Sequence, residues 1–143
     1  MARNKLTRRR SASRGPAPLT HPASGSLGIA YARVVEIACR LPGTEESRSY
    51  GTPSLKVKGK LLSRLRTEAE GGLAIRCDFV DRHMLMQADP ETFYVTDHYL
   101  DYPMVLIDLH RVRWDAMPGI IEQGWRLVAA PKLIAELEAR HRE

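Results

Sequence analysis

The sequence predicts an α+β fold, with a mostly antiparallel five-stranded sheet and helices packed on one face. Between residues 54 and 109, short segments rich in apolar and β-branched residues alternate with glycine turns, which is typical of strands. Segments with apolar residues at three- and four-residue spacing precede, interrupt and follow these strands. Strands in a meander with helices around them favour an antiparallel sheet that is covered on one side. The expected order is α-β(3)-α-β(2)-α-α.

The first helix is expected over residues 27–40, with Ser26 as its N-cap. Apolar side chains at helical spacing form one stripe along it, namely Tyr31, Val34, Val35, Ala38 and Leu41. The pair Pro42-Gly43 ends the helix. Residues 44–53 are polar without a regular pattern, and they are expected to form a loop.

Three strands are expected next, over residues 54–58, 61–66 and 73–78, joined by glycine turns. Side chains of a strand point alternately to its two faces. With aligned registers, one face of this meander is apolar, and the other is a cation face. The cation face comprises Lys56, Lys58, Arg64, Arg66 and Arg76.

A second helix is expected over residues 79–88, capped by Asp78 and ended by Asp89-Pro90. Its inward face is expected to contain Phe79, Val80, His83, Met84 and Met86 or Gln87, with the two methionines as core filler. A strand over residues 92–96 and a loop over 97–103 follow. Residues 104–109 are the most apolar segment, and they are expected to form a strand in the middle of the sheet.

Two helices complete the expected fold. Asp115 is the N-cap candidate for a helix over residues 116–129, where Pro118 fits the first turn. Its apolar stripe consists of Ile120, Ile121, Gly124, Trp125 and Val128. The last helix covers residues 131–140, and it is expected to bury Leu133, Ile134 and Leu137.

The basic character of the chain is concentrated at its N-terminus. The formal net charge is +5 and the pI is near 9.5. Residues 1–26 contain no acid and six bases, whereas residues 27–143 hold 16 bases against 17 acids. We expect residues 1–26 to be a disordered basic tail and residues 27–143 to be one nearly neutral domain. The tail is a candidate for non-specific nucleic-acid contact or for an organelle transit peptide, and a tail without a dedicated role is the third alternative.

The remaining bulk features indicate a cytoplasmic protein. Cys39 and Cys77 are expected to be buried free thiols in a reducing compartment, although a disulfide stays open as an alternative. No apolar run is long enough to cross a membrane. The histidines show no paired ligand spacing, and motifs of nucleotide-binding and hydrolase sites are missing. We therefore expect no metal, no cofactor and no enzymatic activity.

Two groups of residues are candidate binding sites. The cation face could follow a phosphate backbone, with Trp114 as a platform for base stacking, whereas Trp125 is expected in the core. The alternative is a solvated sheet face whose charges prevent edge pairing. The loop over residues 97–102 contains the ligand-binding candidates Asp97, His98, Tyr99 and Tyr102.

That loop has three interpretations. The first is acid–base chemistry, for which the imidazole of His98 is suited. A small ligand could also lie between this loop and residues 45–50. The pattern favours a structural role, in which Asp97 and Asp101 cap turn amides while Tyr99 and Tyr102 pack.

Six strings in a fixed order carry a family resemblance: CRLPGTEE (39–46), GTPS (51–54), VKGKL (57–61), DHYLDYPMVL (97–106), EQGWRL (122–127) and APK (130–132). Together they resemble the MmcQ/YjbR family over about residues 28–141. The resemblance implies an α-β(3)-α-β(2)-α domain with a fold shared with type III secretion chaperones. Family members are commonly labelled DNA-binding, and the family supplies no catalytic residues to carry over. DNA, a second copy of the chain and another protein are therefore the candidate partners, and a membrane is not.

Overall fold

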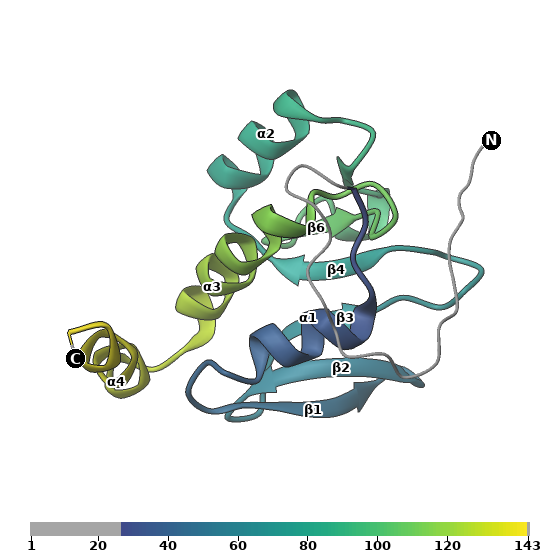
Figure 1. The fold of residues 1–143 in the computed structure, drawn as a ribbon. Helices are drawn as coiled ribbons and strands as arrows, with labels where there is room; N and C mark the ends of the chain where they lie inside the picture. Colours follow the sequence, from purple (N-terminus) through teal and green to yellow (C-terminus); the bar gives the residue numbers. More distant parts are fainter. Residues whose placement is uncertain (1–26, 143) are drawn as a thin grey trace.

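The computed structural model describes residues 27–142, which form four α-helices and a six-stranded antiparallel sheet (Figure 1). The strands are β1 (Thr44–Ser49), β2 (Thr52–Val57), β3 (Lys60–Leu65), β4 (Leu73–Arg76), β5 (Phe93–Tyr94) and β6 (Met104–Ile107). The helices are α1 (Tyr31–Ala38), α2 (Phe79–Ala88), α3 (Met117–Val128) and α4 (Pro131–His141), and two 3-10 turns are η1 (Asp97–Tyr99) and η2 (Trp114–Ala116). The predicted α+β class and antiparallel sheet are confirmed, with six strands instead of five.

The sheet has the order β1-β2-β3-β4-β6-β5. The additional strand is β1, which the sequence predicts as a loop. It pairs with β2 over six residue pairs, from Thr44 opposite Val57 to Ser49 opposite Thr52. Its residues are all exposed or half-buried, so it lacks the apolar alternation that identifies a strand in a sequence. Charged residues on such an edge strand also prevent pairing with other molecules.

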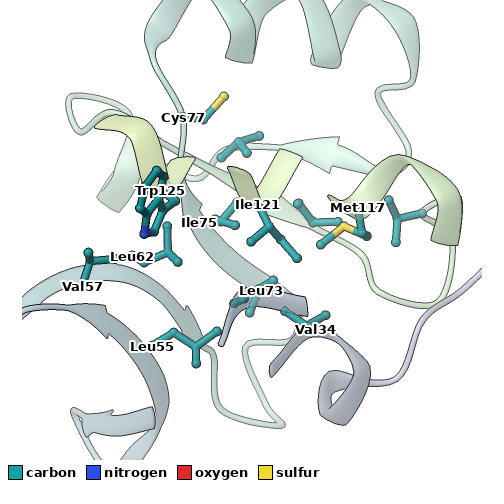
Figure 2. Packing of buried hydrophobic residues seen from close by; sticks show 14 of the residues in the cluster. Val34, Leu55, Val57, Leu62, Leu73, Ile75, Cys77, Met117, Ile121 and Trp125 are labelled. Atoms are coloured by element: carbon teal, nitrogen blue, oxygen red, sulfur yellow. The ribbon is translucent and has the colours of Figure 1, made fainter. Parts of the chain in front are cut away.

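All four helices contribute to one core on the same face of the sheet. Fully buried side chains of this core come from α1 and α3 as well as from the strands, and Figure 2 shows Trp125 beside Leu62 and Val34 beside Leu73. Helix α4 adds Leu133 and Leu137, whereas α2 adds half-buried side chains. The expected packing of helices on one sheet face is therefore confirmed.

A β-bulge adjusts the expected register of the second and third strands. Leu55 lies opposite Ser63, but Lys56 lies opposite Leu61, so that Leu62 is the extra residue. Leu62 belongs to the large core, and Leu61 packs instead on the opposite face. Strict alternation along the strand predicts the opposite, with Leu62 on the cation face beside Arg64 and Leu61 on the apolar face. Alternation alone does not anticipate a bulge.

The first and third helices begin later than the sequence predicts. Helix α1 starts at Tyr31, and Ala30 is at its N-cap position. The predicted cap Ser26 and the predicted disorder of residues 1–26 lie outside the described residues. Helix α3 has Ala116 at its N-cap, because Asp115 belongs to η2 and pairs with Arg113.

Helix α2 has the predicted bounds and the predicted cap, since the Asp78 carboxylate accepts a hydrogen bond from the Asp81 amide. Its orientation differs from the prediction. Val80 and Met84 are exposed, so the expected core role of Met84 is wrong. The inward side carries Leu85, Met86 and a buried arginine, Arg82.

Three smaller expectations also need correction. Strand β5 has two residues instead of the expected five, and β6 ends at Ile107 while it pairs on both sides with β4 and β5. Cys39 is exposed next to the end of α1, whereas Cys77 is buried as expected, and both are free thiols. No helix in the described part of the chain is long and apolar enough to span a membrane.

Candidate functional site

The pairing register places Lys56, Arg64 and Arg76 on one face of the sheet, which also carries Ala74, Met104 and Leu106. Arg64 is the most strongly held of these cations. Its guanidinium donates hydrogen bonds to the Ser49 carbonyl and to the Thr52 hydroxyl, at 3.3 Å and 3.1 Å. It also lies 3.6 Å from the Glu70 carboxylate and 5.4 Å from the centre of the Tyr50 ring. Only 11% of its side chain is exposed, so this cation mainly stabilises the fold.

The other four cations of the cation face differ in their contacts and in their exposure. Arg66 donates to the Gly71 carbonyl at 3.2 Å and lies over the Tyr99 ring, and Arg76 donates to the Leu61 carbonyl at 3.1 Å. Lys56 lies opposite Glu45 on β1, and this neighbouring negative charge weakens the attraction of Lys56 for an anion. Lys58 lies in the turn after β2 and is exposed there. The structure therefore engages the three arginines of the cation face in internal contacts, and nucleic-acid binding by this face stays a prediction.

The loop that contains His98 is attached to α2 by Arg82. The guanidinium donates to the carbonyls of Tyr99, Leu100, Tyr102 and Met104, at distances from 2.9 to 3.2 Å. A buried cation with four carbonyl acceptors is well compensated for its desolvation. The loop thus has a fixed backbone, in line with the structural role that its sequence favours.

The loop side chains follow that role only in part. Tyr99 is buried, and its hydroxyl lies 3.5 Å from the Arg64 guanidinium. Tyr102 is 56% exposed, so its expected packing in the interior is wrong. The His98 ring contacts the edge of the Tyr99 ring, with 4.9 Å between the centroids. Within residues 27–142, Asp97 and Asp101 form no side-chain hydrogen bond, so the expected capping is absent there.

A groove suited to a ligand lies elsewhere, between α2 and α3. It has a volume of about 570 Å³ and is open to solvent. One wall consists of α2 side chains, the other of α3 side chains, and the floor is formed at the end of β4 and at η2. The lining residues are Arg76, Cys77, Asp78, Asp81, Met84, Leu85, Ala116, Gly119, Ile120, Gln123 and Leu127.

The rim of this groove is apolar. Met84, which lines the groove from α2, is 63% exposed. Leu127 on the opposite wall is 49% exposed. Large apolar side chains that gather on the surface around a concave site indicate an interaction surface.

The polar groups of the groove do not form a reactive site of a familiar kind. Burial, together with the negative charges of Asp81 and Asp78, raises the pKa of the Cys77 thiol to about 11. The thiol is therefore protonated at neutral pH, which makes it a weak nucleophile. No group of three or more metal-ligating side chains occurs among the residues that the structure describes.

Sequence reasoning missed the groove because it assigned the wrong side of α2 to the core. Phe79, Val80 and Met84 follow a helical spacing, but Leu85 and Met86 make the other side of the helix apolar as well. A ten-residue helix with apolar side chains on both sides is a signal that one side faces something other than its own core.

Comparison with known proteins gives a family match. The family model named YjbR matches residues 39–127, which include β1 to α3 and therefore both walls of the groove. No curated protein and no solved structure gives a significant match.

Proposed function

The chain belongs to the YjbR family, and on that premise we propose that it acts as a protein-interaction module rather than as an enzyme. In this proposal, the groove between α2 and α3 receives apolar side chains from a segment of another protein. The observation that carries the proposal is the exposure of Met84 and Leu127, which line the groove from opposite walls. Removing these side chains from water is a favourable contribution that the folded chain alone does not obtain.

The shape of the groove favours a protein segment over a small molecule. Pockets for small ligands typically enclose most of the ligand surface. Here the apolar side chains stand at an open rim, and the two walls are helices. An amphipathic segment that lies along two helices is a common mode of peptide recognition.

A direct test is the binding of a fluorescently labelled amphipathic peptide of about 12 residues, with leucines at three- and four-residue spacing. Gly119→Leu should weaken binding about tenfold or more, since a Cβ at Gly119 meets no atom within 4 Å and a larger side chain would occupy the groove. Ala135→Leu is the matched control, because it adds the same side chain to an exposed position of α4. Fluorescence anisotropy gives the dissociation constants.

Two results would contradict this function. Equal loss of binding in both leucine variants would show that the peptide does not use the groove. If the leucine peptide gives no more signal with the wild-type chain than a peptide with serines in place of the leucines, apolar side chains contribute nothing to binding.

Weak nucleic-acid binding is the second candidate function, and one observation favours it. Residues 1–26 carry six bases and no acid, namely Arg3, Lys5, Arg8, Arg9, Arg10 and Arg14. Such a segment attracts phosphates regardless of sequence. The sheet arginines are engaged in internal contacts, so the tail is the stronger candidate for these phosphate contacts.

A salt titration against duplex DNA tests this candidate. Replacing Arg8, Arg9 and Arg10 by Gln should reduce the slope of log K against log salt by about 3, since each phosphate contact contributes about 0.9. The control replaces three exposed cations of the domain, Lys60, Lys132 and Arg142, and changes the net charge equally. Identical slopes for both variants would assign binding to overall charge and not to the tail.

A further inference from the structure

We propose that the segment received by the groove is a basic amphipathic helix, whose apolar side chains fill the groove while a Lys or Arg side chain pairs with Asp78 and Asp81. This inference rests on the proposed interaction function, and it adds the charge and the conformation of the partner. It follows from the carboxylates of the groove, from the positions of the nearby cations and from the spacing of the apolar side chains.

Both carboxylates line the groove and retain capacity for a cation. One oxygen of Asp78 accepts the Asp81 amide at 2.7 Å, as the cap of α2. Neither side chain belongs to an ion pair with any described residue. A carboxylate offers several acceptor positions, so the capping bond of Asp78 leaves room for a second donor.

The two nearest arginines are engaged elsewhere. Arg76 lines the groove, but its Nε donates to the Leu61 carbonyl on β3 at 3.1 Å. The guanidinium of Arg82 donates to three carbonyls of the loop that precedes β6 and to the carbonyl of Met104 in β6. The carboxylates therefore determine the sign of the charge that an incoming side chain meets at this end of the groove, and they favour a cation.

The apolar side chains along the walls have helical spacing. Ile120 and Leu127 of the groove lining are seven residues apart on α3, and Met84 lies on the opposite wall, on α2. Seven residues of a helix extend about 10 Å. A partner helix with apolar side chains at positions i, i+4 and i+7 matches this length, and it leaves its polar side chains free to reach Asp81.

Three peptides of about 12 residues test the sign of the charge. They share one leucine pattern and carry Lys, Gln or Glu at the remaining positions. The Lys peptide should bind about tenfold more tightly than the Glu peptide at low salt, and this preference should decrease as the salt concentration approaches about 1 M. Equal affinity of the three peptides would overturn the inference, although it would leave the interaction function intact. Lack of binding by all three would overturn both.

A pair of matched variants tests the location of the charge. Asp81→Asn should reduce the preference for the Lys peptide about threefold, whereas Glu68→Gln should not change it. Both substitutions remove one negative charge, but Glu68 is exposed in the turn before β4 and does not line the groove. An equal effect of the two variants would assign the preference to overall charge and overturn the inference.

Other occupants give different results. If a second copy of this chain fills the groove, light scattering detects a dimer that Gly119→Leu converts to a monomer. If the basic N-terminal residues fill it, replacing Arg8, Arg9 and Arg10 by Gln strengthens binding of the Lys peptide. Either result would overturn the assignment to a partner helix, whereas a monomer with unchanged peptide affinity supports it.

Discussion

Helix α3 carries two glycines in opposite surroundings. A Cβ at Gly124 would lie 2.6 Å from the carbonyl oxygen of Arg76 and 3.3 Å from a methyl group of Leu62. A Cβ at Gly119, five residues earlier, would meet no atom within 4 Å. One side of the helix is therefore in close contact with the sheet, and the other side borders unfilled space.

The same difference extends to the neighbouring side chains. Met117, Ile121 and Trp125 are fully buried on the packed side of α3, whereas Leu127 is half exposed on the groove side. Helix α2 repeats this arrangement, since Arg82 is buried and Met84 is exposed. Each helix stabilises the fold through one side, and the two remaining sides together form the groove. Stability and binding should therefore respond to different substitutions.

The largest effect is expected for Trp125→Ala. Trp125 is fully buried, and its indole N–H donates to the Pro42 carbonyl at 2.9 Å. Truncation should destabilise the fold by about 4 kcal/mol in urea unfolding, because it leaves a cavity and removes this hydrogen bond. Leu127→Ala on the groove side is the matched control, with an expected cost below about 1 kcal/mol.

Should Trp125→Ala fail to fold, Trp125→Phe provides a milder measurement. It keeps most of the apolar volume and removes the N–H donor, so a loss of about 2 kcal/mol is expected. Equal losses for Trp125→Phe and Leu127→Ala would contradict the distinction between the two sides of α3.

A smaller loss is expected for Gly124→Ala. The added methyl group would approach the Arg76 carbonyl of β4 more closely than carbon and oxygen atoms tolerate, so α3 must move away from the sheet. Overpacking of this kind costs about 2 kcal/mol, which exceeds the gain in helix propensity. Chemical unfolding would show this loss, and an unchanged unfolding midpoint would mean that α3 does not pack closely on β4.

The sequence predicts the core of the fold well, because its strongest patterns lie there. Val34, Ile121 and Trp125 are placed in the core by helical spacing alone, and the buried β6 follows from its apolar run. Strand β1 could not be predicted, since an edge strand held by backbone pairing needs no apolar side chains. The bulge at Leu62 was likewise invisible to strict alternation.

The candidate site was less predictable than the core for a related reason. Arginine is rarely buried, so nothing in the sequence indicates that Arg82 takes the inward position of α2 and turns Met84 outward. The groove depends on that rotation and on the distance between two helices that are separated by about 30 residues of chain. The cation face was visible in the sequence, but the internal acceptors of its three arginines, such as the Ser49 carbonyl, were not.

Cys77, at the floor of the groove, should make the stability of the fold depend on pH in the alkaline range. The folded state holds the Cys77 pKa at about 11 against a usual value of 9.0, because of burial and the charges of Asp81 and Asp78. A raised pKa in the folded state contributes stability that is present below pH 9 and is lost as the pH rises to about 11. Cys77→Ala should lose less stability than the wild type across this range, by about 2 kcal/mol. Tyr31, whose pKa is raised to about 12 by burial, is present in both proteins and does not affect the difference.

The smallest effect, and the one of opposite sign, is expected for Gly119→Ala. The residue is exposed in the first turn of α3, and the added methyl group meets open space. Alanine restricts the unfolded chain and favours the helix, so the variant should be more stable by about 0.5 kcal/mol. Thermal unfolding of the Gly119→Ala and Gly124→Ala variants, measured side by side, compares the same substitution at two positions of one helix. If Gly119→Ala destabilises the chain instead, other atoms occupy the space beside it, and the groove then belongs to the packed interior and has no room for a partner.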